Sequence, residues 1–498
     1  MNNHDYQITE EELQRYRQRG YNEDLLPKPL SKRMMGTFNY FTLWMGSVHN
    51  IPNYTAVGGF LFLGLSPINI MLALVISALA VALFMTFNGR AGSKYGIPFA
   101  IHLRSTYGDV GAKLPGFLRG CVAAIAWFGL QNFTGSLALL ILIGKIWPDF
   151  LTLGGNTEIF GISIPGLIAF TIFWLVNMLI GLGGGNILNK FTAILSPLIY
   201  IVFGGMTIWA IRVAGGIGPI LSYDVSGATH SVSPILVYFM IISSVLAVWA
   251  APGSSVSDFT QNAKSTRDQT IGQTTSLLVG YGIFAFSSVV ILIGGSIHYG
   301  IQEWNILNIV DRWDNTFAIV VAMLVFLLTT VSTNATGNII PAAYQLCALF
   351  PKKLNYQKGV LLASVISFLI MPWKLMENAD SIYLFLNTIG AVLGPVAGTM
   401  IAHYYFVQRQ TIDLDQLYMD QKADNQENVY KGLNKPAYIA TISALLICLC
   451  GNFIPALKII SDVSWLAGFA SAFCLYLLLR KYWVKSENSE LDKNKQVD

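Results

Sequence analysis

Apolar residues in this chain recur in blocks that are separated by shorter polar stretches. The blocks lie near residues 37–64, 68–88, 115–144, 164–184, 191–213, 233–253, 271–297, 316–349, 357–373, 380–407, 436–456 and 463–482. A helix of about 20 residues is long enough to cross a hydrocarbon core of ~30 Å. The pattern therefore predicts an all-α polytopic membrane protein with 12 transmembrane helices.

The composition agrees with this prediction. Of the 498 residues, 54% are hydrophobic and only 12% are charged, about half the charged share of soluble domains. A soluble enzyme with so little charge could not cover its surface. The net charge of +4 and the lack of a basic run predict no nucleic-acid partner. We expect membrane lipid as the surroundings and no cleaved signal peptide.

The distribution of basic residues predicts the orientation. If the N-terminus is inside, ten basic residues fall in inner loops (Arg90, Lys94, Arg104, Lys113, Lys190, Lys264, Arg267, Lys352, Lys353, Lys358) and five in outer loops (Lys145, Arg212, Arg312, Lys374, Lys458). Because positive residues favour the cytoplasmic side, we expect a cell-membrane protein with both termini in the cytoplasm. Residues 1–36, 408–435 and 483–498 would form a cytoplasmic N-terminal segment, linker and tail.

Two spans carry interruptions at matching places. The first span contains Asn50-Ile51-Pro52-Asn53, and the sixth contains 250–255 (AAPGSS). Proline removes a backbone donor, and freed backbone groups are tolerated in a membrane only where they line an enclosed cavity. The alternative is an ordinary proline kink. The spacing predicts inverted five-helix repeats at about 37–213 and 233–407, a ten-helix core at 37–407, and helices 11–12 at 436–482.

Polar side chains concentrate in spans one, three, six and eight, where they are costly and tend to mark pathways. Asn50 lies at the first break, Trp127 and Gln131 share a face of span three, and Trp249 precedes the second break. Span eight contains 329–338 (TTVSTNATGN). Indoles can stack on a flat ring, and carboxamides match its N–H and C=O edge. This set holds no charged residue, so it predicts a neutral planar ligand; the alternative for each Trp is packing or an interfacial position.

The hydroxyls of Thr329, Ser332 and Thr333 suggest a second site. Sodium prefers oxygen ligands, and carbonyls freed at the first break could complete the set. The alternative is that these hydroxyls bond only to the preceding turn of their own helix.

Several segments resemble the nucleobase–cation symporter-1 family over residues 25–482. They are 44–52 (WMGSVHNIP), 127–131 (WFGLQ), 258–260 (DFT), 332–338 (STNATGN) and 394–398 (GPVAG). Within the family the sequence is most similar to bacterial allantoin permeases, through residues 49–52, 372–377 (PWKLME) and 394–398. The resemblance implies a five-plus-five inverted repeat with two extra C-terminal helices, alternating access, and import of nucleobases, hydantoins or allantoin.

The resemblance also implies roles for particular residues. Trp127 and Trp249 would enclose the substrate ring, and Gln131, Asn338 and Asn50 would bond its polar edge. The sodium ligands would be the carbonyls of Gly46, His49 and Thr329 with the hydroxyls of Ser332 and Thr333.

Val248 is the sixth residue expected to contact the substrate, and the sequence departs from the family pattern there and at Asn50. Hydantoin transporters of the family have glutamine where Asn50 stands, and Val248, beside the second Trp, replaces a glycine. Both changes argue against hydantoin. Some allantoin permeases lack a hydroxyl at the position of Thr333, so its presence here favours sodium coupling.

We therefore expect a monomeric, sodium-coupled importer of allantoin that is not an enzyme and uses no cofactor besides the ion. The alternative is a proton-coupled or uncoupled permease for uracil, cytosine, another purine-related compound or hydantoin; His49 is the titratable candidate in the core. A channel would need a pore motif, which the sequence does not show. An enzyme would need partners for His102, His298 or His403, and none is apparent.

Overall fold

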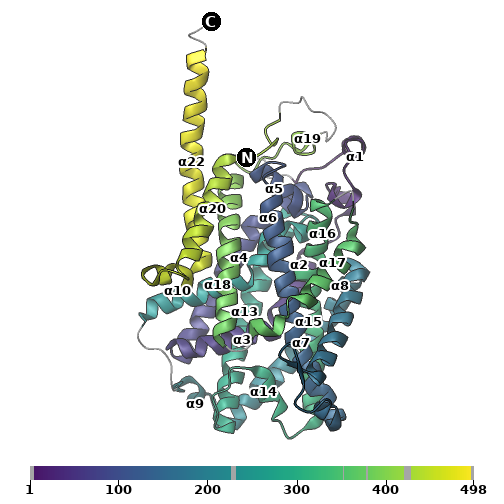
Figure 1. Cartoon of the computed structure of the whole chain (residues 1–498), viewed down its shortest axis with the longest axis vertical. Coiled ribbons are helices and arrows are strands. Elements are labelled where there is room, and N and C mark those ends of the chain that lie inside the picture. The colour runs from purple at the N-terminus through teal and green to yellow at the C-terminus, as the bar shows by residue number, and fades with distance from the viewer. Residues whose placement is uncertain (1–4, 226–231, 351–352, 377–378, 420–427, 495–498) are drawn as a thin grey trace.

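The computed structural model describes residues 5–225, 232–350, 353–376, 379–419 and 428–494. Lys352, Glu377 and parts of the predicted N-terminal segment, linker and tail lie outside these ranges. Figure 1 shows a helical bundle with α1, α5, α6 and α19 at one end and α9 and α14 at the other. The C-terminal helix α22 extends past the end that carries α1, so the two terminal helices share one end of the molecule, as an even number of crossings requires.

Most predicted spans correspond to helices. The long elements are α2 (Thr37–Val48), α3 (Ile51–Phe60), α4 (Pro67–Tyr95), α7 (Ala124–Ile146), α8 (Ile164–Val213), α10 (Pro234–Val248), α13 (Thr266–Tyr299), α15 (Thr316–Asn334), α16 (Ile340–Leu349), α17 (Tyr356–Leu369), α18 (Ala379–Ala402), α20 (Lys435–Cys450) and α22 (Ser464–Asn494). Among the described residues, six helical stretches are long and apolar enough to cross a membrane, or seven with one bent pair. Four shorter apolar helices accompany them. The chain is a multi-pass helical protein.

Short elements connect and extend these helices. They are α1 (Glu10–Gln18), α5 (Phe99–Tyr107), α6 (Lys113–Phe117), α9 (Ile217–Leu221), α11 (Ala250–Ser254), α12 (Ser257–Thr260), α14 (Ile306–Asp311), α19 (Leu414–Leu417), α21 (Lys458–Asp462), and the antiparallel strands β1 (Glu158–Ile159) and β2 (Ile162–Ser163). Three-residue to five-residue 3₁₀ turns occur at η1 (Glu23–Leu25), η2 (Leu30–Lys32), η3 (Leu61–Leu63), η5 (Pro148–Thr152), η7 (Pro372–Met376) and η9 (Pro455–Leu457).

Three segments have π-helical winding, which the sequence did not predict. They are η4 (Leu118–Ala123) before α7, η6 (Ala335–Ile339) between α15 and α16, and η8 (His403–Val407) after α18. Such winding inserts an extra residue per turn and is frequent at functional sites. Two of the three, η4 and η6, adjoin the helices that carry the predicted site.

The spans predicted at 164–184 and 191–213 form one helical run, α8, which contains Pro197. Its two apolar stretches, Ile164–Gly183 and Pro197–Val213, correspond to the two predicted spans. Both ends of α8 nevertheless lie at the same end of the bundle. The run follows the end of α7, where Lys145 pairs with Asp311 of α14 at 3.0 Å. Near its own end, Trp209 packs on Trp313 at 5.1 Å. One straight helix could not place both ends there.

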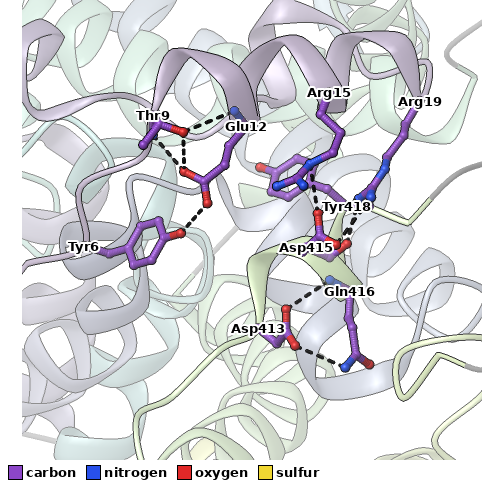
Figure 2. A network of polar contacts seen from close by, with 9 residues as sticks. All are labelled: Tyr6, Thr9, Glu12, Arg15, Arg19, Asp413, Asp415, Gln416 and Tyr418. Atoms are coloured by element: carbon purple, nitrogen blue, oxygen red, sulfur yellow. Dashed lines mark hydrogen bonds and ion pairs between the residues drawn. The ribbon is translucent and has the colours of Figure 1, made fainter.

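The N-terminal segment folds onto the linker between α18 and α20. Tyr16 of α1 stacks on Tyr418 with ring centroids 4.6 Å apart, and the Tyr418 hydroxyl donates to the carbonyl of Leu25 at 2.6 Å. Arg15 and Arg19 reach Asp415 at 3.2 and 3.0 Å. Figure 2 shows the ion pairs that Arg15 and Arg19 make with Asp415. Exposed ion pairs contribute little, so the buried tyrosines carry most of this contact.

A second contact in Figure 2 fixes the start of α1. Thr9 and Glu12 form a reciprocal cap at the helix N-terminus, and the Tyr6 hydroxyl donates to Glu12 at 2.7 Å. Burial and this hydrogen bond raise the pKa of Tyr6 to about 12. The Tyr6 hydroxyl is therefore protonated, and is a donor, at neutral pH.

We predict that Tyr418→Ala releases α1 from the linker. Removing a buried aromatic ring costs about 3–5 kcal/mol, more than the exposed ion pairs supply. Trypsin cleavage of the purified protein after Arg15, Arg17 and Arg19 should become faster. Tyr482→Ala, at a side chain that is 70% exposed, is the control. Equal cleavage of both variants would contradict the packing described here.

Candidate functional site

The first interruption lies between α2 and α3, where His49 and Asn50 leave the helical conformation. The side-chain oxygen Oδ1 of Asn50 accepts from the backbone N–H of Asn53 at 3.1 Å, and the side-chain Nδ2 of Asn50 donates to the backbone carbonyl of Ser47 at 2.9 Å. The side chain of Asn53 donates to the carbonyl of Val48 at 2.6 Å. Two asparagine side chains thus replace backbone hydrogen bonds at the break. Asn50 is a helix cap here, which the sequence analysis did not foresee.

The same rearrangement removes the usual hydrogen-bond donors of two backbone carbonyls, those of Gly46 and His49. In a continuous helix, the carbonyls of Gly46 and His49 would accept from the amides of Asn50 and Asn53. Here the amide of Asn50 donates to Val48 and that of Asn53 to the Asn50 side chain. The helical donors of these two carbonyls are therefore engaged elsewhere, as the sodium hypothesis requires.

The second interruption follows α10. Pro252 has no N–H, so the carbonyl of Val248 lacks the donor that a continuous helix would supply. The short helix α11 ends at Ser254, and its last turn is held from helix α4. There Asn88 donates to the carbonyls of Gly253 and Ser254 at 2.8 and 2.9 Å. A polar side chain from a neighbouring helix again satisfies backbone that the break has freed.

A cavity lies between the two interruptions and the helices beside them. Its lining comes from α2 and α3, α7, α10 and α11, and α15 with η6: Trp44, Ser47, Asn50, Asn53, Trp127, Gln131, Val248, Trp249, Pro252, Thr333, Thr336, Gly337 and Asn338. All six residues predicted to bind substrate are in this set, and no lining residue is charged. The structure thus brings together residues from four separate helical spans, while their role toward a substrate stays a prediction.

The two predicted ring-enclosing indoles have different surroundings. Trp127 packs edge-on against Phe385 at 4.9 Å, and its N–H has no hydrogen-bond partner among the described residues. Trp249 lies 5.9 Å from Trp44 and donates its N–H to the hydroxyl of Tyr281. Trp249 is therefore held in place by its own polar atom, whereas the N–H of Trp127 can serve a ligand.

The amide groups of the lining are oriented by a chain of asparagines. Asn338 donates to Asn334 at 2.9 Å, and Asn334 donates to Asn177 at 3.2 Å and approaches Asn132 at 3.4 Å. This bond uses one N–H of the Asn338 side chain and leaves its carbonyl oxygen to act as an acceptor. The carbonyl oxygen of Gln131 has no hydrogen-bond partner within the described part of the chain. Two acceptors are thus available for the N–H groups of a ligand.

The predicted sodium ligands are divided between the cavity and its surroundings. Thr333 lines the cavity, and its hydroxyl is buried without a hydrogen-bond partner among the described residues. Gly46, His49, Thr329 and Ser332 do not line the cavity. The Thr329 hydroxyl donates to the carbonyl of Phe326 at 3.0 Å, the local bond that the alternative interpretation expected. The oxygen atoms are of the type that sodium prefers, with Thr333 and the two freed carbonyls fitting best.

Three polar residues near the cavity were missed by the sequence analysis. Arg119, in η4, is fully buried, and Asn88 of α4 is 1% exposed. Asp258, in α12, is 8% exposed, and its carboxylate accepts from the amide of Phe99 at 2.9 Å. Asp258 belongs to the segment 258–260 that carries the family resemblance, but the sequence analysis gave it no role, and it does not line the cavity. A charged residue inside the predicted span 115–144 was a signal that could have identified Arg119.

Comparison with known proteins decides the family. A model of permeases for cytosine/purines, uracil, thiamine and allantoin matches residues 27–468. The chain belongs to this family. It is 58% identical over 476 residues to a permease of Escherichia coli (strain K12) whose name proposes allantoin as its substrate. The match covers 95% of this chain and 98% of the relative. It is 37% identical to an allantoin permease of Bacillus subtilis (strain 168), covering 94% and 95%.

The fold of this permease agrees with a solved structure. That structure is Mhp1, a nucleobase-cation-symport-1 family transporter, in a closed conformation with bromovinylhydantoin bound. The TM-score is 0.75 at 21% identity, with 94% of this chain and 96% of Mhp1 covered. The predicted family is confirmed, and because the relatives are permeases, the chain is a multi-pass transport protein and not an enzyme.

We predict that Gly337→Ala narrows the ligand cavity of this permease. A Cβ at Gly337 would meet no protein atom within 4 Å, so the added methyl group extends into open space beside Asn338 without disturbing the fold. Ligand affinity should fall about tenfold, or about 1.4 kcal/mol, while thermal stability stays unchanged. Gly282→Ala, where a Cβ also meets nothing within 4 Å but lies outside the cavity lining, is the control. Unchanged affinity of the Gly337 variant would place the ligand elsewhere.

Proposed function

We propose that this permease imports allantoin, a neutral planar ureide heterocycle, by alternating access and with sodium as the coupling ion. The observation that carries the proposal is the uncharged cavity between two interrupted helices, which is lined by three indoles, those of Trp44, Trp127 and Trp249, and by amide side chains. Allantoin has several N–H donors and carbonyl acceptors on a flat ring. Those groups match the free acceptors of Gln131 and Asn338 and the free N–H of Trp127.

The relatives support the choice of substrate. Two of the most similar curated proteins carry allantoin in their names, at 58% and 37% identity over nearly the whole chain. The family as a whole also includes carriers of cytosine, purines and uracil. We take the substrate ring to lie between Trp127 and Trp249. We also take both termini of the chain to lie in the cytoplasm.

Sodium coupling is favoured over proton coupling by two features. The carbonyls of Gly46 and His49 have lost their helical donors, and the hydroxyl of Thr333 is buried nearby without a partner among the described residues. The His49 imidazole faces an aromatic cluster, with Nδ1 3.0 Å from the Tyr54 hydroxyl and the ring 4.8 Å from Phe203. A ring packed in this way has a structural role, which argues against His49 as a proton carrier.

Uptake of radiolabelled allantoin by cells that express the protein tests the proposal. Uracil, cytosine, hydantoin and hypoxanthine serve as unlabelled competitors, in sodium and in choline buffer. Saturable allantoin uptake that depends on sodium supports both substrate and ion. Uptake indifferent to sodium would remove the ion from the proposal, and uptake of a nucleobase in place of allantoin would overturn the substrate.

We predict that Trp127→Ala and Gln131→Ala abolish measurable uptake while membrane insertion persists. Loss of an indole face removes about 1.5–3 kcal/mol of apolar contact, which corresponds to roughly 10- to 100-fold in affinity. Trp147→Ala, at a side chain that is 53% exposed, is the matched control and should transport normally. Normal uptake by both cavity variants would contradict the site.

We also predict that Thr333→Val weakens allantoin binding chiefly by weakening the binding of sodium. Valine keeps the shape of threonine but removes the hydroxyl, and coupling between two ligands is reciprocal. Sodium titration of allantoin binding should show a higher midpoint for this variant. Thr275→Val is the control, because that hydroxyl bonds to its own helix at Ile271. An unchanged midpoint would exclude Thr333 as an ion ligand.

A further inference from the structure

One buried guanidinium connects η4 to two segments beside the cavity, the end of α11 and η6. Arg119 lies in η4, directly before the helix that carries Trp127 and Gln131, and is fully buried. Its Nε donates to the hydroxyl of Ser255 at 3.1 Å, just after α11. Its Nη2 donates to the carbonyl of Gly337 in η6 at 2.8 Å. The side chain therefore joins span three to the end of the sixth-helix break and to the π segment that displays Asn338.

Arg119 lies on one side of the cavity. It precedes Trp127 by eight positions in a span that starts beside α5 and α6, at the end of the bundle that carries α1 and α19 (Figure 1). The side chain of Gln345 packs against Gly116 and Gly120, on either side of Arg119. Gln345 belongs to α16, so this contact packs α16 against the segment that carries Arg119.

The layer around Arg119 contains more polar atoms than it satisfies. Arg119 Nη1, Ser254 Oγ, Asp258 Oδ2, His102 Nε2 and Gln345 Nε2 are buried and have no hydrogen-bond partner among the described residues. Such groups are costly where no water reaches them. A conformation that admits water into this layer would satisfy all five, so the layer is chemically suited to open.

We propose that Arg119 is the positioning residue that holds this inner side of the cavity closed. It connects Ser255 to Gly337. A route from the cavity toward the end that carries α1 opens when the guanidinium releases one of these contacts and water enters the layer. The proposal rests on the transport function proposed above. Lysine keeps the charge, but its single ammonium cannot reproduce the two-armed geometry of the guanidinium. Arg119 does not line the cavity, so it acts on the movement of the helices and not on ligand contact.

Arg119→Lys and Ser255→Ala test the proposal by separate routes. The first substitution weakens both contacts, and the second removes only the hydroxyl that accepts the hydrogen bond from Nε of Arg119. Each variant is combined with Ser254→Cys, at a fully buried position, in a background whose five cysteines are replaced by alanine. Inside-out vesicles are labelled with a membrane-impermeant maleimide, and allantoin uptake and allantoin binding are measured in parallel. Arg212→Lys, at the far end of α8, is the matched control.

We expect both variants to raise the labelling of Ser254→Cys several-fold, to lower uptake about tenfold, and to change allantoin affinity by less than about threefold. Unchanged labelling in both variants would overturn the proposal. A parallel fall in affinity, uptake and thermal stability without increased labelling would also overturn it, because that result indicates a purely structural arginine. Labelling needs no substrate, so it tests Arg119 even if wild-type protein fails to bind allantoin, an outcome that would overturn the proposed function alone.

Discussion

The architecture of the site depends on how backbone polar groups are satisfied where two helices are interrupted inside the bundle. In hydrocarbon, every unsatisfied amide or carbonyl costs several kcal/mol. At the first break, Asn50 and Asn53 supply the missing hydrogen bonds from within the break itself. At the second, Asn88 reaches across from α4. The breaks are stable because these side chains complete them, and the cavity lies where the two breaks meet.

Satisfying the breaks with side chains also determines which groups stay available for ligands. The carbonyls of Gly46, His49 and Val248 lose their ordinary helical donors, and all three lie beside residues that line the cavity. The neighbouring asparagine chain through Asn334 fixes the orientation of Asn338. A cavity without charge, enclosed by oriented amides and indoles, favours a neutral ring with both donors and acceptors over an amino acid or a phosphate.

The sequence predicted these features where they depend on residue types with strong local effects. Pro52 and Pro252 interrupt helices through their own covalent structure, so both breaks were visible, and Trp127 and Gln131 share a face through helical spacing alone. The π segments η4 and η6 have no comparable local signature, because their winding depends on contacts such as that between Arg119 and Gly337. The contact between α1 and the linker was also not predictable. It unites Tyr16 and Tyr418, which are distant in the chain and belong to segments without apolar periodicity.

The proposed function requires that the substrate ring binds in the cavity between the two interruptions. A structure of the permease determined by electron cryomicroscopy with allantoin bound would test it most directly. We expect density for the ring between Trp127 and Trp249, with its N–H edge toward Gln131 and Asn338. Density elsewhere, for example in the separate cavity beside Trp209 and Trp313, would contradict it.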